Sequence, residues 1–145
     1  MLLLFFLLTT LCFSYINCKQ RTTEDDWFVK KYQPEYIKKG DGKTYPRIGD
    51  EVKILYVYTH TKTHKEIFSK WDKKDPEKFE VGRNFVTKCL DDTILRMSKR
   101  EKIKVFCHSE NAYGNQGLEM VNISSNMNFY AEIKLLDVIR KRVDI

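Results

Sequence analysis

The chain has 145 residues, of which 42% are hydrophobic and 32% are charged. This length and balance are typical of one globular domain and exclude a fibrous or wholly disordered protein. The formal net charge is +6 at pH 7, but the basic residues are spread in pairs among nearly as many acids, with no stacking-aromatic motif between them. We therefore expect solvated surface charge and no nucleic-acid partner.

Residues 1–18 carry no charged side chain and begin with a run of Leu and Phe that breaks at Ser14 and Tyr15. The run is shorter than the ~20 residues that span a bilayer, and Cys18 is small enough to precede a cleavage point. The segment is predicted to be a removable signal peptide, which places the protein in the endoplasmic reticulum lumen or outside the cell. An uncleaved anchor is the alternative, because the segment lacks an N-terminal Lys or Arg.

Removal of this segment leaves Cys89 and Cys107 as the cysteines of the mature chain. Two cysteines make no disulfide framework. In an oxidising compartment they can form one bridge, but each lies in an apolar-patterned stretch where a buried free thiol is equally expected. The sequence leaves both alternatives open.

Polar residues 19–26 are predicted to form a flexible lead-in, and the chain beyond them has strand character. Apolar side chains at every second position are typical of strands that are buried on one face. The strand-like segments that precede the helix are residues 27–36, 51–59, 64–69 and 77–81.

Residues 84–97 change to a helical period, because Val86, Leu90 and Ile94 lie four residues apart. Strand-like alternation returns at residues 101–107 and, after a long irregular stretch, at residues 127–138. Most connections are too short for parallel crossovers. The sequence therefore predicts an α+β domain in which an antiparallel sheet covers one short helix.

Several short motifs together resemble those of the FKBP-type peptidyl-prolyl isomerases. They are Gly40-Asp41-Gly42 with Pro46 and Gly49-Asp50, Phe79-Glu80-Val81-Gly82, Met97-Ser98, Asn111-Ala112-Tyr113-Gly114 and Glu132-Ile133-Lys134-Leu135-Leu136. Their consistent order and spacing are more specific than any single motif. The resemblance implies a strongly curved antiparallel sheet wrapped around the short helix, with an apolar pocket between them. It places the isomerase domain at residues 27–139 and a basic C-terminal tail at residues 140–145.

The activity that this resemblance implies is rotation of the peptide bond before proline. Amide resonance gives that bond a barrier of ~18–20 kcal/mol. A catalyst lowers the barrier by holding the amide twisted in a water-poor apolar cavity, with donors aimed at its carbonyl group. No bond breaks, so no cofactor is expected. By position, Tyr56 and Tyr113 are similar to the family's pocket tyrosines, and the main-chain N–H of Thr87 is similar to its carbonyl donor.

Other positions correspond to the walls of the family's pocket. The predicted substrate-binding residues are Ile67, Phe68, Val86, Leu90 and Ala131. Without gaps, Phe68 stands where the family has a pocket Asp. If the insertion near residues 61–65 is placed differently, Phe68 becomes the wall aromatic and Ser69 takes the Asp position. Glu77 and Ala131 each replace an aromatic wall residue.

These replacements predict a weak isomerase of proline-containing polypeptide clients, with weak macrolide binding, because each lost contact that costs ~1.4 kcal/mol slows catalysis tenfold. A catalytically inactive binding module of the same fold is the alternative. We expect a monomer that does not associate with membranes after signal removal. His60 and His64 share a hairpin rather than a helix, so no metal site is expected. Asn122-Ile123-Ser124 fits an N-glycosylation sequon in the loop that rims the pocket.

Overall fold

The computed structural model describes residues 26–141. The predicted signal peptide at residues 1–18 and nearly all of the lead-in at residues 19–26 lie outside the described residues, so both remain predictions. In the described range no helix has the length and apolar character needed to cross a membrane. The described residues fall into two compact units, 26–33 and 34–141.

The strand expected at residues 27–36 is wrong over most of its length. Residues 26–32 form a helix, and a strand, β1 (Glu35–Lys38), begins only afterwards. Within the helix the ring centroids of Phe28 and Tyr32 lie 5.4 Å apart. These two rings are four residues apart and therefore share one face of a helix. The strand was predicted because aromatic residues have high strand propensity. The four-residue spacing of the two rings fits a helix instead.

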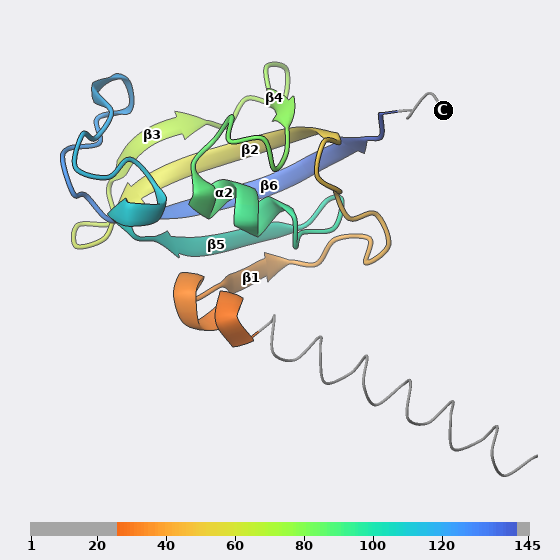
Figure 1. The fold of residues 1–145 in the computed structure, drawn as a ribbon, viewed down its shortest axis with the longest axis horizontal. Helices are drawn as coiled ribbons and strands as arrows, with labels where there is room; N and C mark the ends of the chain where they lie inside the picture. The colour runs from red at the N-terminus through yellow and green to blue at the C-terminus, as the bar shows by residue number, and fades with distance from the viewer. Residues whose placement is uncertain (1–25, 142–145) are drawn as a thin grey trace, which may run out of the picture. The chain divides into compact units, whose positions relative to one another are not determined.

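The second unit is built on one six-stranded antiparallel sheet (Figure 1). Its other strands are β2 (Glu51–His60), β3 (Glu66–Lys70), β4 (Glu77–Glu80), β5 (Lys102–Cys107) and β6 (Phe129–Ile139). The strand order is β1-β5-β6-β2-β3, and β4 also pairs with β2. The segments expected from the period-two alternation are thus confirmed, with small shifts at their ends, apart from the first.

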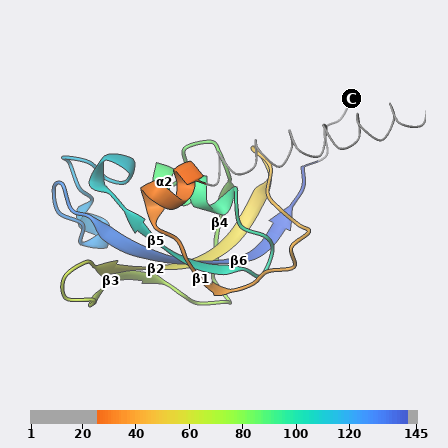
Figure 2. The same cartoon turned by 90° about the horizontal axis from the view of Figure 1, so that it is seen from below.

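The helix α2 (Lys88–Ile94) lies on the concave side of this curved sheet (Figure 2). Leu90 and Ile94 are fully buried, as are Ile54 and Ile133 of the sheet. The predicted α+β fold, with a curved antiparallel sheet around one short helix, is therefore confirmed in this unit. The helix is shorter than expected because Thr87 has an extended backbone, with φ −61° and ψ 151°, so the preceding residues form a loop.

A disulfide joins α2 to the end of β5. Cys89 and Cys107 are both fully buried, and their Cα atoms lie 5.7 Å apart. Of the two alternatives that the sequence left open, the structure contains the bridge. Because Cys107 directly precedes the long loop between β5 and β6, the bridge fixes the beginning of that loop to the N-terminal turn of the helix.

The first residues of the basic tail are attached to the surface of the domain. A guanidinium nitrogen of Arg140 lies 3.6 Å from the carboxylate of Asp50, and the ammonium group of Lys141 pairs with Glu80. Residues 142–145 lie outside the described range.

Candidate active site

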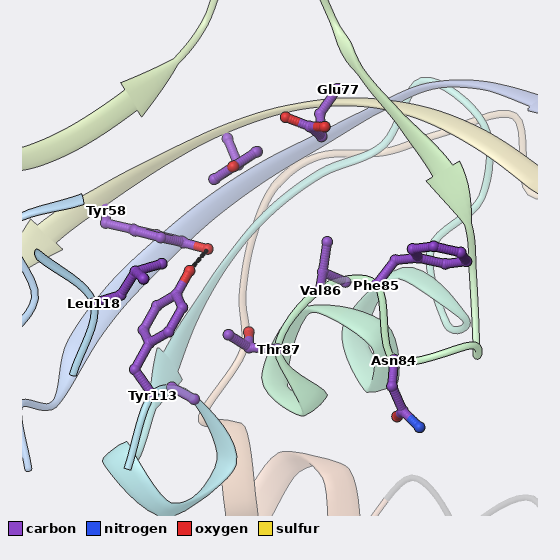
Figure 3. Close-up of a pocket in the computed structure, with 10 residues that line it drawn as sticks. Tyr58, Glu77, Asn84, Phe85, Val86, Thr87, Tyr113 and Leu118 are labelled. Carbon is purple, nitrogen blue, oxygen red and sulfur yellow. Dashed lines mark hydrogen bonds between the residues drawn. The ribbon is translucent and has the colours of Figure 1, made fainter. Parts of the chain in front are cut away.

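A cavity of about 410 Å³ opens between β2, β4, the loop before α2 and the long loop after β5 (Figure 3). It is lined by Tyr56, Tyr58, Glu77, Asn84, Phe85, Val86, Thr87, Ala112, Tyr113 and Leu118. The structure therefore brings together four of the predicted site residues, which come from separate parts of the chain. These four are Tyr56, Val86, Thr87 and Tyr113.

The loop before α2 is held in place by the buried carboxylate of Asp91. One carboxylate oxygen accepts a hydrogen bond from the Gly82 N–H at 3.0 Å, and the other accepts one from the Asn84 N–H at 3.3 Å. Gly82 has φ +75°, and a Cβ atom there would lie 2.9 Å from a side-chain carbon of Ile48. Only glycine fits this position without strain. Asp91 of the helix thus fixes the preceding loop, and this loop places Val86 at the cavity.

Thr87 joins this loop to the helix and contributes an unpaired polar group. Its carbonyl accepts a hydrogen bond from the Asp91 N–H at 3.0 Å, as expected for the residue that caps a helix. Its side-chain oxygen is buried and has no hydrogen-bond partner among residues 26–141. A buried polar group without a partner costs about 1–3 kcal/mol. Thr87 thus lines the cavity, and its hydroxyl oxygen is buried without a partner in the described protein.

Two tyrosine hydroxyl groups meet in the cavity. The hydroxyl of Tyr58 lies 3.3 Å from that of Tyr113 (Figure 3). Tyr58 is 1% exposed, and its ring centroid lies 4.5 Å from that of Phe129. Burial raises the pKa of both phenols above the ordinary value. Both groups are therefore neutral at physiological pH and can act as hydrogen-bond donors.

Tyr58 is a cavity residue that the sequence reasoning missed. It pairs with Ala131 across β2 and β6, and Ala131 is fully buried. Side chains at such paired positions lie about 4.5–5.5 Å apart at Cβ, so a small residue on one strand leaves room for a large ring on the other. The available signal was the shared parity of Tyr56 and Tyr58 together with the alanine on the last strand.

On β3, the register places Phe68 rather than Ile67 beside the tyrosines. Phe68 pairs with Tyr58, and its ring centroid lies 5.8 Å from that of Tyr56. Ile67 has the opposite parity and faces the other side of the sheet. This geometry favours the alignment in which Phe68 is the wall aromatic and Ser69 stands at the Asp position. Phe68 packs against the rings of Tyr56 and Tyr58 but is not among the residues that line the cavity, so its contact with a substrate remains a prediction.

Leu90 and Ala131 lie away from the surface of the cavity. Both side chains are fully buried, and neither is among the lining residues. Leu90 belongs to the buried face of α2, and Ala131 lies opposite Tyr58 in the sheet. The structure assigns both residues to packing, and their contact with a substrate remains a prediction.

Glu77 introduces a negative charge where the resemblance implies an aromatic wall. It pairs with Ile54 across β4 and β2, and it shares the inward face of β4 with Phe79, which is buried. Burial is the main reason that the pKa of Tyr56 lies above its ordinary value, and the charge of Glu77 raises it further. The cavity is therefore more polar on this side than an aromatic wall would make it.

The two histidines of the hairpin between β2 and β3 have separate local contacts. The His60 Nδ1 atom accepts a hydrogen bond from the Lys62 N–H at 3.1 Å. The His64 ring stacks on Tyr130, with 6.1 Å between centroids. Within residues 26–141, no group of three or more His, Cys, Asp or Glu side chains is placed to hold a metal ion.

The curved sheet, the short helix and the tyrosine-lined cavity at the start of that helix define a domain of the FKBP class. Comparison with known proteins agrees. The family model described as FKBP-type peptidyl-prolyl cis-trans isomerase matches residues 42–136, and the chain belongs to this family. Over 102 residues it is 32% identical to the peptidyl-prolyl cis-trans isomerase Fkbp12 of Drosophila melanogaster, which covers 70% of this chain and 93% of the relative.

Two solved structures have the same fold. The crystal structure of the three FKBP domains of wheat FKBP73 matches with a TM-score of 0.68 and 21% identity over 74% of this chain, which spans 46% of that longer chain. The N-terminal domain of FKBP42 from Arabidopsis thaliana matches with a TM-score of 0.65 and 18% identity, over 74% of this chain and 85% of the other. At these identities the likeness concerns the fold alone.

Proposed function

We propose that this protein is a peptidyl-prolyl cis-trans isomerase of the secretory pathway whose activity on proline-containing polypeptides is reduced. The observation that carries the proposal is the cavity that joins Tyr56, Val86, Thr87 and Tyr113. It combines apolar surface with polar groups at its wall. That combination suits a reaction in which an amide is only twisted and no bond is broken.

The proposed mechanism uses the two sides of the cavity differently. Tyr56 and Val86 provide the surface against which the proline ring packs, so that water leaves the X-Pro amide. The Tyr113 hydroxyl and the Thr87 main-chain N–H provide donors for carbonyl groups of the polypeptide. Interactions that are stronger with the twisted amide than with the planar one lower the barrier.

Two features support reduced activity and weak macrolide binding. Glu77 adds a carboxylate to the wall, and removing water from that carboxylate opposes burial of an apolar ring beside it. Ala131 is fully buried opposite Tyr58 and offers no surface to a ligand. Each such loss of about 1.4 kcal/mol corresponds to a tenfold lower rate.

Two features support the secretory compartment. The first is the apolar segment at residues 1–18. The second is the buried disulfide between Cys89 and Cys107, since disulfides persist in oxidising compartments and are rare in the cytosol. The expected location is the endoplasmic reticulum lumen or the outside of the cell.

The test is an isomerisation assay on a short X-Pro peptide, with the full chain expressed in a eukaryotic secretory host and Drosophila Fkbp12 measured beside it. We expect acceleration over the uncatalysed rate, but at least about tenfold less than that of Fkbp12. Tyr113→Phe is the matched variant, because it removes only the hydroxyl group, and it should lower the rate further. A rate equal to that of Fkbp12 contradicts the reduced activity, and a rate equal to the uncatalysed one contradicts the isomerase.

A non-catalytic binding module is the second candidate function, and Glu77 is the observation that favours it. A charged wall can still hold a polypeptide while preventing the dry contact that the twisted amide requires. NMR titration with the same peptide separates the two functions. Binding at the cavity residues without any acceleration of isomerisation identifies the module.

A further inference from the structure

One negative charge faces the interior of an otherwise neutral cavity. Of the described residues that line it, Glu77 is the one that carries a charge at pH 7. Figure 3 shows Glu77 beside the strands of the sheet, with Val86 and Phe85 near the helix and the Tyr58–Tyr113 pair on the opposite side of the view. Glu77 is therefore part of the surface that a segment bound in the cavity contacts.

Within residues 26–141, no cation of the protein pairs with Glu77. The acids on either side of it differ in this respect, because Asp75 pairs with Lys70 and Glu80 pairs with Lys141. The pKa of Lys70 is raised mainly by its hydrogen bond to Asp75, and the charge of Glu77 raises it less. Its ammonium group is thus already engaged. The side chain of Glu77 is half-buried. A cation on a bound ligand can therefore form a charge-assisted hydrogen bond with its carboxylate.

The rim of the cavity suits a long basic side chain. Phe85 is 66% exposed and Leu118 is 38% exposed, and both line the cavity. Lysine and arginine pack their aliphatic stems on such apolar surface and carry their charge at the tip. A basic residue beside the proline of a bound segment can therefore cover this rim and reach the carboxylate.

We propose that Glu77 makes this cavity select proline-containing polypeptides in which a Lys or Arg stands next to the proline. The inference rests on the proposed function, in that it takes the cavity as the X-Pro site. The net charge of +6 attracts acidic partners at long range. A preference for basic segments must therefore arise from the local contact with Glu77, and this allows one substitution to test it.

The test uses pairs of peptides that differ only in charge. In one pair, Lys beside the proline is replaced by norleucine, which has a similar stem without the ammonium group; in the other, Arg is replaced by citrulline. Each pair is made with the basic residue before and after the proline. Binding to the full chain is measured by fluorescence anisotropy, and isomerisation is measured on the same peptides. We expect the basic peptide to bind about tenfold more tightly in at least one position, which corresponds to about 1.4 kcal/mol.

Two variants assign the preference to its source. Glu77→Gln removes the charge and keeps the shape, so the ratio of the two affinities should fall to about one. Glu80→Gln removes the same charge from the same strand, but Glu80 pairs with Lys141 and does not line the cavity. This control should keep the tenfold ratio. Thermal unfolding of both variants verifies that each is folded.

The outcomes separate this inference from the proposed function. Selective binding of the basic peptide without any isomerisation supports the role of Glu77 and refutes the isomerase. Isomerisation of charged and neutral peptides at equal rates with equal affinities supports the isomerase and refutes the role of Glu77. A preference that survives in Glu77→Gln also refutes it, and the absence of both binding and isomerisation for every peptide refutes both.

Discussion

The hydroxyl of Tyr58 has one hydrogen-bond partner among the described residues, the hydroxyl of Tyr113, at 3.3 Å. Tyr58 is 1% exposed, whereas Tyr113 is only partly buried at the cavity. A buried donor must be satisfied where it lies. We infer that Tyr58 donates to Tyr113, which leaves the Tyr113 proton available to a ligand in the cavity. In the proposed function, Tyr58 is then a positioning residue for the Tyr113 hydroxyl, the proposed donor to the substrate.

Tyr58→Phe is therefore expected to weaken the donor without removing it. A neutral hydrogen bond contributes about 0.5–1.5 kcal/mol, so isomerase activity should fall about two- to tenfold. Tyr113→Phe removes the donor itself and should lower activity at least as much. Both rates are measured on the same X-Pro peptide, with thermal unfolding as the check on folding.

The double variant distinguishes positioning from a separate contribution. If Tyr58 acts through Tyr113, then Tyr58→Phe has no further effect on activity once Tyr113→Phe is present. Effects that multiply independently would show that the two hydroxyl groups act separately. A rise in the activity of Tyr58→Phe would show that Tyr58 competes with the substrate for Tyr113.

Much of the fold was predictable because local pattern and burial agree in it. Along β2, alternate residues such as Val52 and Ile54 are apolar and are fully buried on the side of the helix. The helix was predictable from the four-residue spacing of Leu90 and Ile94. The helix at residues 26–32 was missed because its aromatic residues have high strand propensity, although the four-residue spacing of Phe28 and Tyr32 was an available helical signal.

The site was predictable in part, for a different reason. Tyr113 lies in a family motif, and Tyr56 and Thr87 occupy positions that correspond to the family's pocket, so the resemblance located all three at the cavity. The role of Tyr58 depends on its partner on another strand, Ala131, whose small size matters only once the register is known. The disulfide likewise depends on the distance between two separate elements, which no local pattern contains.

The disulfide is expected to contribute roughly 3 kcal/mol to stability, because it closes a loop of similar length to the ~15-residue case for which that value is typical. Cys89 and Cys107 are 18 residues apart in sequence and fully buried. Reduction, or the double variant Cys89→Ala with Cys107→Ala, should therefore lower the free energy of unfolding by that amount. Urea unfolding with and without reductant measures the change.

The double cysteine variant is also the control for the reductant, to which it should be insensitive. Thiol titration of the native protein should detect no free thiol from this pair. Equal stability with and without reductant, or a native protein with both thiols free, would contradict the bridge.

Leu90→Ala is expected to lower the free energy of unfolding by roughly 2–5 kcal/mol, because it leaves a cavity in the core. Leu90 is fully buried on α2, whereas Met120 is 87% exposed. Met120→Ala removes a side chain of similar size from the surface and should change stability by less than about 0.5 kcal/mol. Chemical denaturation of both variants tests the contrast, and equal losses would contradict the assigned burial.

Because Tyr58 pairs with Ala131, we expect that a larger side chain at position 131 can fill the space left by a smaller one at position 58. Ala131→Phe alone forces a second ring into filled space and should cost about 1–3 kcal/mol. Tyr58→Ala alone opens a cavity and should cost about 3–5 kcal/mol, by analogy with other buried aromatic residues. In the double variant the new ring occupies the space that the tyrosine leaves, so the total loss should be smaller than the sum by more than about 0.5 kcal/mol.

The same double variant places an aromatic ring on β6, so its macrolide affinity, measured by calorimetry, should exceed that of Tyr58→Ala. As a control, Ala131→Phe combined with the exposed substitution Met120→Ala should show additive losses. Additivity in the Tyr58 and Ala131 pair would mean that the two side chains do not share the space that their register indicates.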